Sequence, residues 1–173
     1  MYKRQSESIV LDDNKIKSST YNSDQGYGFR AVTGEVVAYS HSNDISKESL
    51  RKSSDNLKDT LKSKKGTSNH EIPKTNSKYY ENINPIESKT FNSKIDLLNS
   101  VNNYLRSKGS IVNQVTANFL GEHKSIEIIR SDNQILKDDR PLVRFNVSVV
   151  LEKDGKKKQV FMELEEDKVM MII

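Results

Sequence analysis

Three histidines and two pairs of adjacent aspartates could carry metal or acid–base chemistry in this chain. His70-Glu71 comes nearest to a zinc peptidase motif, in which two histidines one helical turn apart bind the metal and a glutamate activates its water. Lys74 and Thr75 occupy the places where the second histidine would stand, and Pro73 would interrupt the helix. We therefore expect His70 to be a loop residue that binds no metal.

The other candidates are explained by the needs of the backbone. His41 and His123 stand alone in or beside expected strands, and we expect each to be an ordinary polar strand residue. Asp12-Asp13 and Asp138-Asp139 could bind a hard cation or exchange protons. Aspartate is also a standard turn former, so we expect both pairs to lie at turns. The sequence predicts no catalytic residue and no metal ligand, and it leaves substrate-binding residues unknown.

Gly26 and Gly28 could begin a phosphate-binding loop. The dinucleotide fingerprint requires a third glycine and a helix immediately after it. Ala31 stands at the third position, and the segment that follows has the pattern of a strand. We expect the two glycines to allow a close approach to the backbone or a bulge instead.

Composition describes one domain or a little more, with a lean core. The 173 residues are only 34% hydrophobic, and the mean hydropathy is −0.75. The chain has no cysteine, which excludes disulfides and thiolate zinc sites and fits a reducing cytosol. We see no secretory leader and no apolar run near the roughly 20 residues needed to cross a bilayer. A cytoplasmic protein without a membrane partner is expected.

A net charge of +4 and a pI near 9.1 raise the question of nucleic-acid binding. The positive charge concentrates in residues 47–65 and in the lysine run 156–158. No nucleic-acid motif or row of stacking aromatics accompanies it. We interpret the lysines as solvated surface and expect no nucleic-acid partner.

Hydrophobic periodicity predicts an α+β fold. Short strands are expected at 8–11, 15–17, 27–32 and 35–39, with turns at 12–14 and 33–34. A helix is expected over 47–64, capped by Ser46 and ended by Gly66. A second helix is expected over 93–108, ended by Gly109, and its buried stripe should be Ile95, Leu98, Val101 and Leu105. The polar connector 66–92 joins them, and strands follow at 111–120, 125–130 and 140–152. The prediction is an antiparallel meander, two helices joined by a polar connector, then a second antiparallel meander.

Two long runs of sequence carry a family resemblance. The first is DQGYGFRAVTGE at 24–35 followed by YSHSNDIS at 39–46, and the second is DDRPLVRFNVSVV at 138–150. They resemble the amino-terminal half of the bacterial TldD/PmbA metallopeptidases, and YYENINPI at 79–86 resembles the family's linker. The resemblance covers roughly residues 4–158, and Arg30 belongs to its pattern.

The resemblance implies a scaffold without the family's chemistry. TldD-type members are described as cytosolic zinc peptidases that pair with a zinc-less sister subunit and cleave unfolded peptides, including leader segments. Their zinc motif, a helical H-E-x-x-x-H, and their cysteine ligand are absent from this chain. Zinc thus belongs to the full-length family, and we expect no cofactor here.

Both ends differ from the family pattern. We expect 1–158 to be a TldD/PmbA-like amino-terminal domain without its first helix, and 159–173 to be a non-homologous tail. When codons for 161–173 are read with an offset of two nucleotides, they permit YGAGGRQGYDDY, which resembles the family's glycine-rich continuation. The codons for Lys156-Lys157-Lys158 can form an uninterrupted run of adenines, a natural site for a one-base slip. The hypothesis is a frameshift at that run.

Two functions remain open at this stage. One is a truncated, inactive scaffold fragment of a TldD-type peptidase; the other is a non-catalytic pairing module for a sister subunit or a separate catalytic half. Whether the chain is an enzyme is left uncertain. Apolar sheet surface left without the first helix, together with the apolar tail, predicts self-association or poor solubility, relieved by deleting 159–173.

The frameshift hypothesis predicts what the neighbouring DNA encodes. If the offset at the codons for 156–158 is removed, the restored frame should encode an H-E-x-x-x-H helix and, later, a cysteine. Sequencing downstream of the gene is the measurement. A restored frame without that motif within a normal gene length would show that no frameshift occurred.

Overall fold

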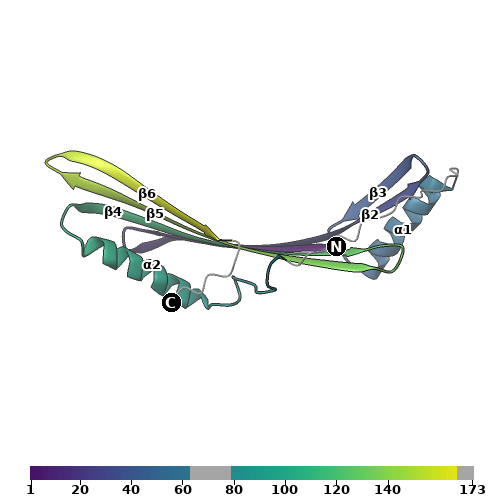
Figure 1. The fold of residues 1–173 in the computed structure, drawn as a ribbon, viewed down its shortest axis with the longest axis horizontal. Helices are drawn as coiled ribbons and strands as arrows, with labels where there is room; N and C mark the ends of the chain where they lie inside the picture. Colours follow the sequence, from purple (N-terminus) through teal and green to yellow (C-terminus); the bar gives the residue numbers. More distant parts are fainter. Residues whose placement is uncertain (63–78, 167–173) are drawn as a thin grey trace. The chain divides into compact units, whose positions relative to one another are not determined.

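The computed structural model describes residues 1–62 and 79–166 (Figure 1). His70, Glu71 and Gly66 lie outside the described residues, as do residues 167–173. The expectations stated for them therefore remain predictions.

The described residues form two helices and a six-stranded antiparallel sheet with strand order β3-β2-β1-β4-β5-β6. The elements are β1 (Tyr2–Asp12), β2 (Lys15–Thr33), β3 (Val36–Ser42), α1 (Lys47–Leu61), α2 (Phe91–Arg106), β4 (Val112–Ile129), β5 (Ile135–Lys153) and β6 (Lys156–Glu166). The predicted α+β fold of antiparallel strands and two helices is confirmed. The two expected meanders belong to one sheet, because β1 lies beside β4.

Strand lengths differ from the prediction. β2 is one strand of 19 residues where the sequence predicts two short ones. Its first eleven residues are exposed on both faces, so they lack the alternation of apolar and polar side chains that identifies a half-buried strand. β4 likewise continues through the expected break at 121–124.

The chain divides into two compact units, and the first contains residues 1–3, 24–78 and 125–138. In this unit α1 packs against β3 (Figure 1). Ser46 caps α1 as predicted, since its hydroxyl accepts a hydrogen bond from the Ser49 N–H at 3.2 Å. The buried Tyr27 hydroxyl lies 2.8 Å from Ser49 Oγ and 2.8 Å from Ser53 Oγ, so hydroxyl groups join the sheet to the helix.

The glycines of β2 allow close approach, as the sequence predicts. A Cβ on Gly28 would lie 2.5 Å from the Tyr39 hydroxyl oxygen. A Cβ on Gly26 would lie 2.9 Å from the carbonyl oxygen of Ser42. Any side chain at these positions would displace a neighbour, which explains their glycines without a phosphate ligand.

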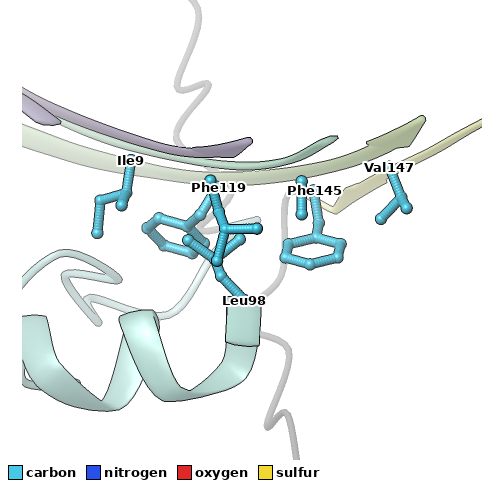
Figure 2. Packing of buried hydrophobic residues seen from close by; sticks show 7 residues of the cluster. Ile9, Leu98, Phe119, Phe145 and Val147 are labelled. Carbon is cyan, nitrogen blue, oxygen red and sulfur yellow. The ribbon is translucent and has the colours of Figure 1, made fainter. Parts of the chain in front are cut away.

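The described residues of the second unit are 4–23, 79–124 and 139–166, and α2 supplies its core. Leu98 is fully buried against Ile9, Phe119 and Phe145 on the sheet (Figure 2). Further apolar residues of the helix pack around this cluster: Ile95, Leu97, Val101 and Leu105. The predicted apolar stripe of the helix is confirmed, although the helix begins at Phe91, where Thr90 is the N-cap.

The sequence analysis missed β6. Asp154 and Gly155 have positive φ angles of 51° and 73°, which match the two central residues of a type I′ hairpin turn. Beyond this turn, β6 pairs with β5 in a continuous register from Lys153↔Lys156 to Val143↔Glu166. Residues 159–166, expected to be part of a non-homologous tail, are therefore a paired strand.

Candidate functional site

A buried ion pair lies between α2 and β1 in the second unit. Lys94 and Glu7 form it, with 5% and 10% of their side chains exposed. The Lys94 ammonium also donates a hydrogen bond to the carbonyl oxygen of Ile86 at 2.6 Å and lies 5.6 Å from the centre of the Phe119 ring. The buried charge is thus neutralised and hydrogen-bonded, as burial requires.

Beside this pair, Gln5 binds residues 84–87, near the end of the polar connector 66–92. We call residues 84–87 the linker. Asn84 Nδ2 donates to Gln5 Oε1 at 2.9 Å, and Gln5 Nε2 donates to the Tyr21 hydroxyl at 2.8 Å and to Glu87 Oε1 at 3.1 Å. Asn84 Oδ1 accepts from the Ile86 N–H at 3.0 Å. We use the name linker clamp for the following residues: Gln5, Glu7, Asn84, Ile86, Glu87 and Lys94.

Gly121 makes room for the linker clamp. A Cβ at this position would lie 3.2 Å from Ile86 Cγ1, a tight contact with a buried side chain. Ile86 therefore sits directly over the sheet, and the clamp fixes residues 84–87 to β1 and β4 by both apolar and polar contacts.

A second charged group surrounds Glu122 on β4. Burial would raise the pKa of this carboxyl, but hydrogen bonds from Lys124 and Arg4 outweigh the burial and hold the pKa below its usual value. The Lys124 ammonium lies 2.7 Å from Oε1, and Arg4 Nε donates to Oε2 at 2.7 Å. Glu122 is therefore a charged, fully partnered carboxylate, and such a group is a poor general acid.

The aspartate pairs differ from each other. Asp12 accepts hydrogen bonds from Gln114, Lys17 and Thr116, which lower its pKa to about 2. Asp13 has a φ of 51° in the β1–β2 turn and forms an ion pair with Arg106. The prediction that this pair lies at a turn is confirmed for Asp13, whereas Asp12 is the last residue of β1 and binds side chains.

The expectation for Asp138-Asp139 is wrong. Both residues lie inside β5, which begins at Ile135. The turn is completed earlier, where Asn133 takes a φ of 63° and its N–H donates to the Arg130 carbonyl oxygen at 3.1 Å. The aspartates therefore follow the turn instead of forming it.

His41, His123 and Arg30 each have different surroundings. His41 is exposed in the first unit, where its ring stacks on Tyr39 at 5.7 Å between centroids. His123 is buried in the second unit, and no hydrogen-bond partner for its Nε2 is found in the described part of the chain. Arg30 is exposed on β2, opposite Tyr39 of β3. Across residues 1–62 and 79–166, no group of three or more His, Cys, Asp or Glu side chains could hold a metal ion.

Sequence reasoning missed the linker clamp, although one signal was present. Lys94 stands four residues before Leu98, on the face of α2 that faces the sheet. A lysine on a buried helix face requires a buried acceptor. Its partner Glu7 is 87 residues away in sequence, so local pattern could not identify it. The described arrangement neutralises its charges and fixes a segment of chain; it presents no paired nucleophile and base.

The chain is similar to known proteins over most of its length. The model of PmbA/TldA metallopeptidase domain 1 matches residues 1–62, and that of the PmbA/TldA metallopeptidase central domain matches residues 84–168. A metalloprotease TldD homolog of Buchnera aphidicola is 34% identical over 88% of this chain and 32% of its own length. The Haemophilus influenzae homolog is 33% identical over 90% of this chain and 33% of its own length.

Solved structures share the fold. TldE from Thermococcus kodakarensis superposes with a TM-score of 0.66 at 11% identity, covering 97% of this chain and 39% of that one. A Thermotoga maritima protein gives 0.69 at 9% identity, covering 96% and 38%. The chain spans about a third of the length of the curated relatives that it matches. No helix in residues 1–62 and 79–166 is long and apolar enough to cross a membrane.

The linker clamp predicts strong energetic coupling between Glu7 and Lys94. Glu7→Gln and Lys94→Met each leave one buried charge without its partner, so each should lower the free energy of unfolding by about 3–5 kcal/mol. Combining Glu7→Gln with Lys94→Met removes both charges, so the double variant should cost less than the sum of the two single variants. Urea unfolding of the four members of the cycle measures the coupling.

A matched control is the exposed pair Lys58–Asp55 on α1, at 3.3 Å. Its coupling should stay within about 0.5 kcal/mol, as for other exposed i,i+3 pairs. If the effects at Glu7 and Lys94 are additive, so that their coupling energy is as small as that of the control, the buried pair does not fix the linker.

The lowered pKa of Asp12 predicts that the free energy of unfolding falls in acid. Its carboxylate is stabilised in the folded state, so its contribution is complete above the unfolded pKa of about 4 and is lost as the pH falls through about 2. This loss should be roughly 1–2 kcal/mol, because 19% of the side chain is exposed and solvent screens it.

Urea unfolding at several pH values between 4 and 2 measures the effect. Asp12→Asn should remove this part of the pH dependence, and Gln114→Ala should reduce it, because the hydrogen bond from Gln114 is the largest contribution. An Asp12→Asn curve parallel to the wild type would contradict the assignment.

Proposed function

The chain belongs to the PmbA/TldD metallopeptidase family, and from this membership we propose that it is the amino-terminal scaffold portion of a TldD-type zinc metallopeptidase, without the zinc site. The observation that carries the proposal is the order of the two family matches, domain 1 at 1–62 and the central domain at 84–168. The curated relatives that match are about three times longer. Zinc and proteolysis are assigned to the remainder of such a full-length protein.

The donor chemistry of this chain supports the absence of a zinc site. Structural zinc needs four ligands, and catalytic zinc commonly takes three from the protein. The chain has three histidines and no cysteine.

A second candidate is a non-catalytic pairing module for a sister subunit or a separate catalytic half. The contacts that hold the linker favour this candidate. A linker held in one position against β1 and β4 by buried groups presents a fixed surface to a partner. In either case we propose a cytoplasmic protein, which the absence of cysteine supports.

The boundary at 158 remains part of the proposal. The central-domain match extends to residue 168 and so includes residues 159–168, which the frameshift hypothesis places in another frame. The DNA downstream of the gene decides between an altered tail and a family sequence that continues to 168.

The purified chain should neither retain zinc nor cleave peptide. After incubation with zinc and removal of the free metal, elemental analysis should give well below one zinc per chain. Unfolded peptides should remain intact with and without a chelator. The full-length Haemophilus influenzae homolog, treated in parallel, is the positive control. Stoichiometric zinc, or cleavage that a chelator stops, would overturn the scaffold assignment.

A further inference from the structure

Within residues 1–62 and 79–166, β6 is an edge strand and nothing covers its apolar face. Among the described residues it pairs with β5 alone (Figure 1). Val160, Met162 and Leu164 lie opposite Val149, Val147 and Phe145 of β5, so they continue the face that α2 covers. Their exposed fractions are 48%, 58% and 38%, which shows that the cover ends before β6.

The charges of β6 are separated by sign along the strand. Its sequence is KKKQVFMELEE, with Lys156, Lys157 and Lys158 at one end and glutamates at the other. Lysines along an edge normally prevent self-pairing, because like charges repel. Here the repulsion applies only to a parallel pair. An antiparallel pair of two such strands brings opposite charges together.

We propose that two copies of this chain associate through their β6 strands, antiparallel and centred on Phe161. In this register Phe161 faces Phe161 of the second copy, and Lys157 faces Glu165 of the second copy. Val160 then faces Met162 of the second copy, which joins the two uncovered apolar faces. The two-fold axis passes between the two Phe161 residues and makes every other contact twice, and the pairing occupies the exposed edge of both strands.

The side chains of β6 are held on the correct faces for this contact. Arg144 Nε lies 2.8 Å from Glu165 Oε2 and 3.3 Å from Glu163 Oε1, and the Lys157 ammonium lies 3.5 Å from Glu152 Oε2. Lys157, Glu163 and Glu165 therefore share one face of the hairpin. A second copy extends these exposed pairs into a network. The inference rests on β6 itself and holds for either proposed function.

Charge reversal tests the register with the full chain. Lys157→Glu places like charges opposite each other in its own dimer, and so does Glu165→Lys, so each variant alone should dissociate at least about tenfold more readily than the wild type. Mixed together, the two variants should form a heterodimer, because every facing pair is then of opposite charge. Analytical ultracentrifugation over a range of concentrations measures the mass against the 19.8 kDa monomer.

The mixing experiment separates the interface from effects within one chain. Both variants lose an internal ion pair, and mixing does not restore it. Lys15→Glu, an exposed lysine at the start of β2, is the control and should associate like the wild type. A wild-type monomer at all concentrations overturns the proposal. So does association that the reversals leave unchanged, or a mixture that remains monomeric.

The absence of cysteine allows a geometric test. Phe161→Cys should form a disulfide between two copies under mild oxidation, since facing residues have Cα atoms about 4.5–5.5 Å apart. Gln159→Cys, on the same face of the strand, is the matched control. In the proposed register its two copies are offset by four residues, about 13 Å, so they should not cross-link. Equal cross-linking of both variants contradicts the register.

Discussion

The burial of Leu98 against β1, β4 and β5 is the contact on which the second unit depends. Leu98 belongs to a row of α2 residues spaced four apart along the helix. Each residue of the row contacts β1 or the turn after it: Lys94, Leu98, Asn102 and Arg106. The row meets Glu7 and Ile9 of β1, then Asn14 and Asp13 of the β1–β2 turn, in nearly the same order along the chain. The helix rises about 18 Å over the twelve steps from Lys94 to Arg106, and six extended steps from Glu7 to Asp13 span about 20 Å, so the two segments have similar lengths.

This match explains why polar groups lie at both ends of a lean core. The apolar middle supplies the burial, and the ends hold the helix in register with hydrogen bonds and ion pairs. A lysine and a glutamate sequestered from water are usually examined as catalytic groups, because perturbed charges concentrate at active sites. Here each charged group is bound by structural partners. Lys94 pairs with Glu7 and donates to the Ile86 carbonyl oxygen, and Asp12 accepts hydrogen bonds from three donors. The same chemistry that could react instead joins a linker and a helix to a sheet.

Local pattern accounted for the helices and for the apolar residues that α2 buries. Ser46 as a cap and Leu98 as a core residue both follow from spacing alone. The contact of β1 with β4 and the partner of Lys94 could not be predicted in this way, since each joins segments far apart in sequence. β6 was missed for another reason. The Asp154-Gly155 turn and the alternation of Val160, Met162 and Leu164 are visible in the sequence, but the prediction for residues 159–173 followed from their difference from a family pattern.

The long separation between β1 and β4 also determines the order in which this sheet can assemble. The Asp13 N–H donates to the Val115 carbonyl oxygen at 3.0 Å, and Thr116 Oγ1 lies 2.9 Å from an Asp12 oxygen across 104 residues. The β5–β6 hairpin closes over two residues and forms on a timescale of about microseconds. The β1–β4 contact must wait for a large loop to close. During synthesis on the ribosome, β1 leaves the exit tunnel long before its neighbour exists, and its apolar face depends on transient protection until β4 arrives.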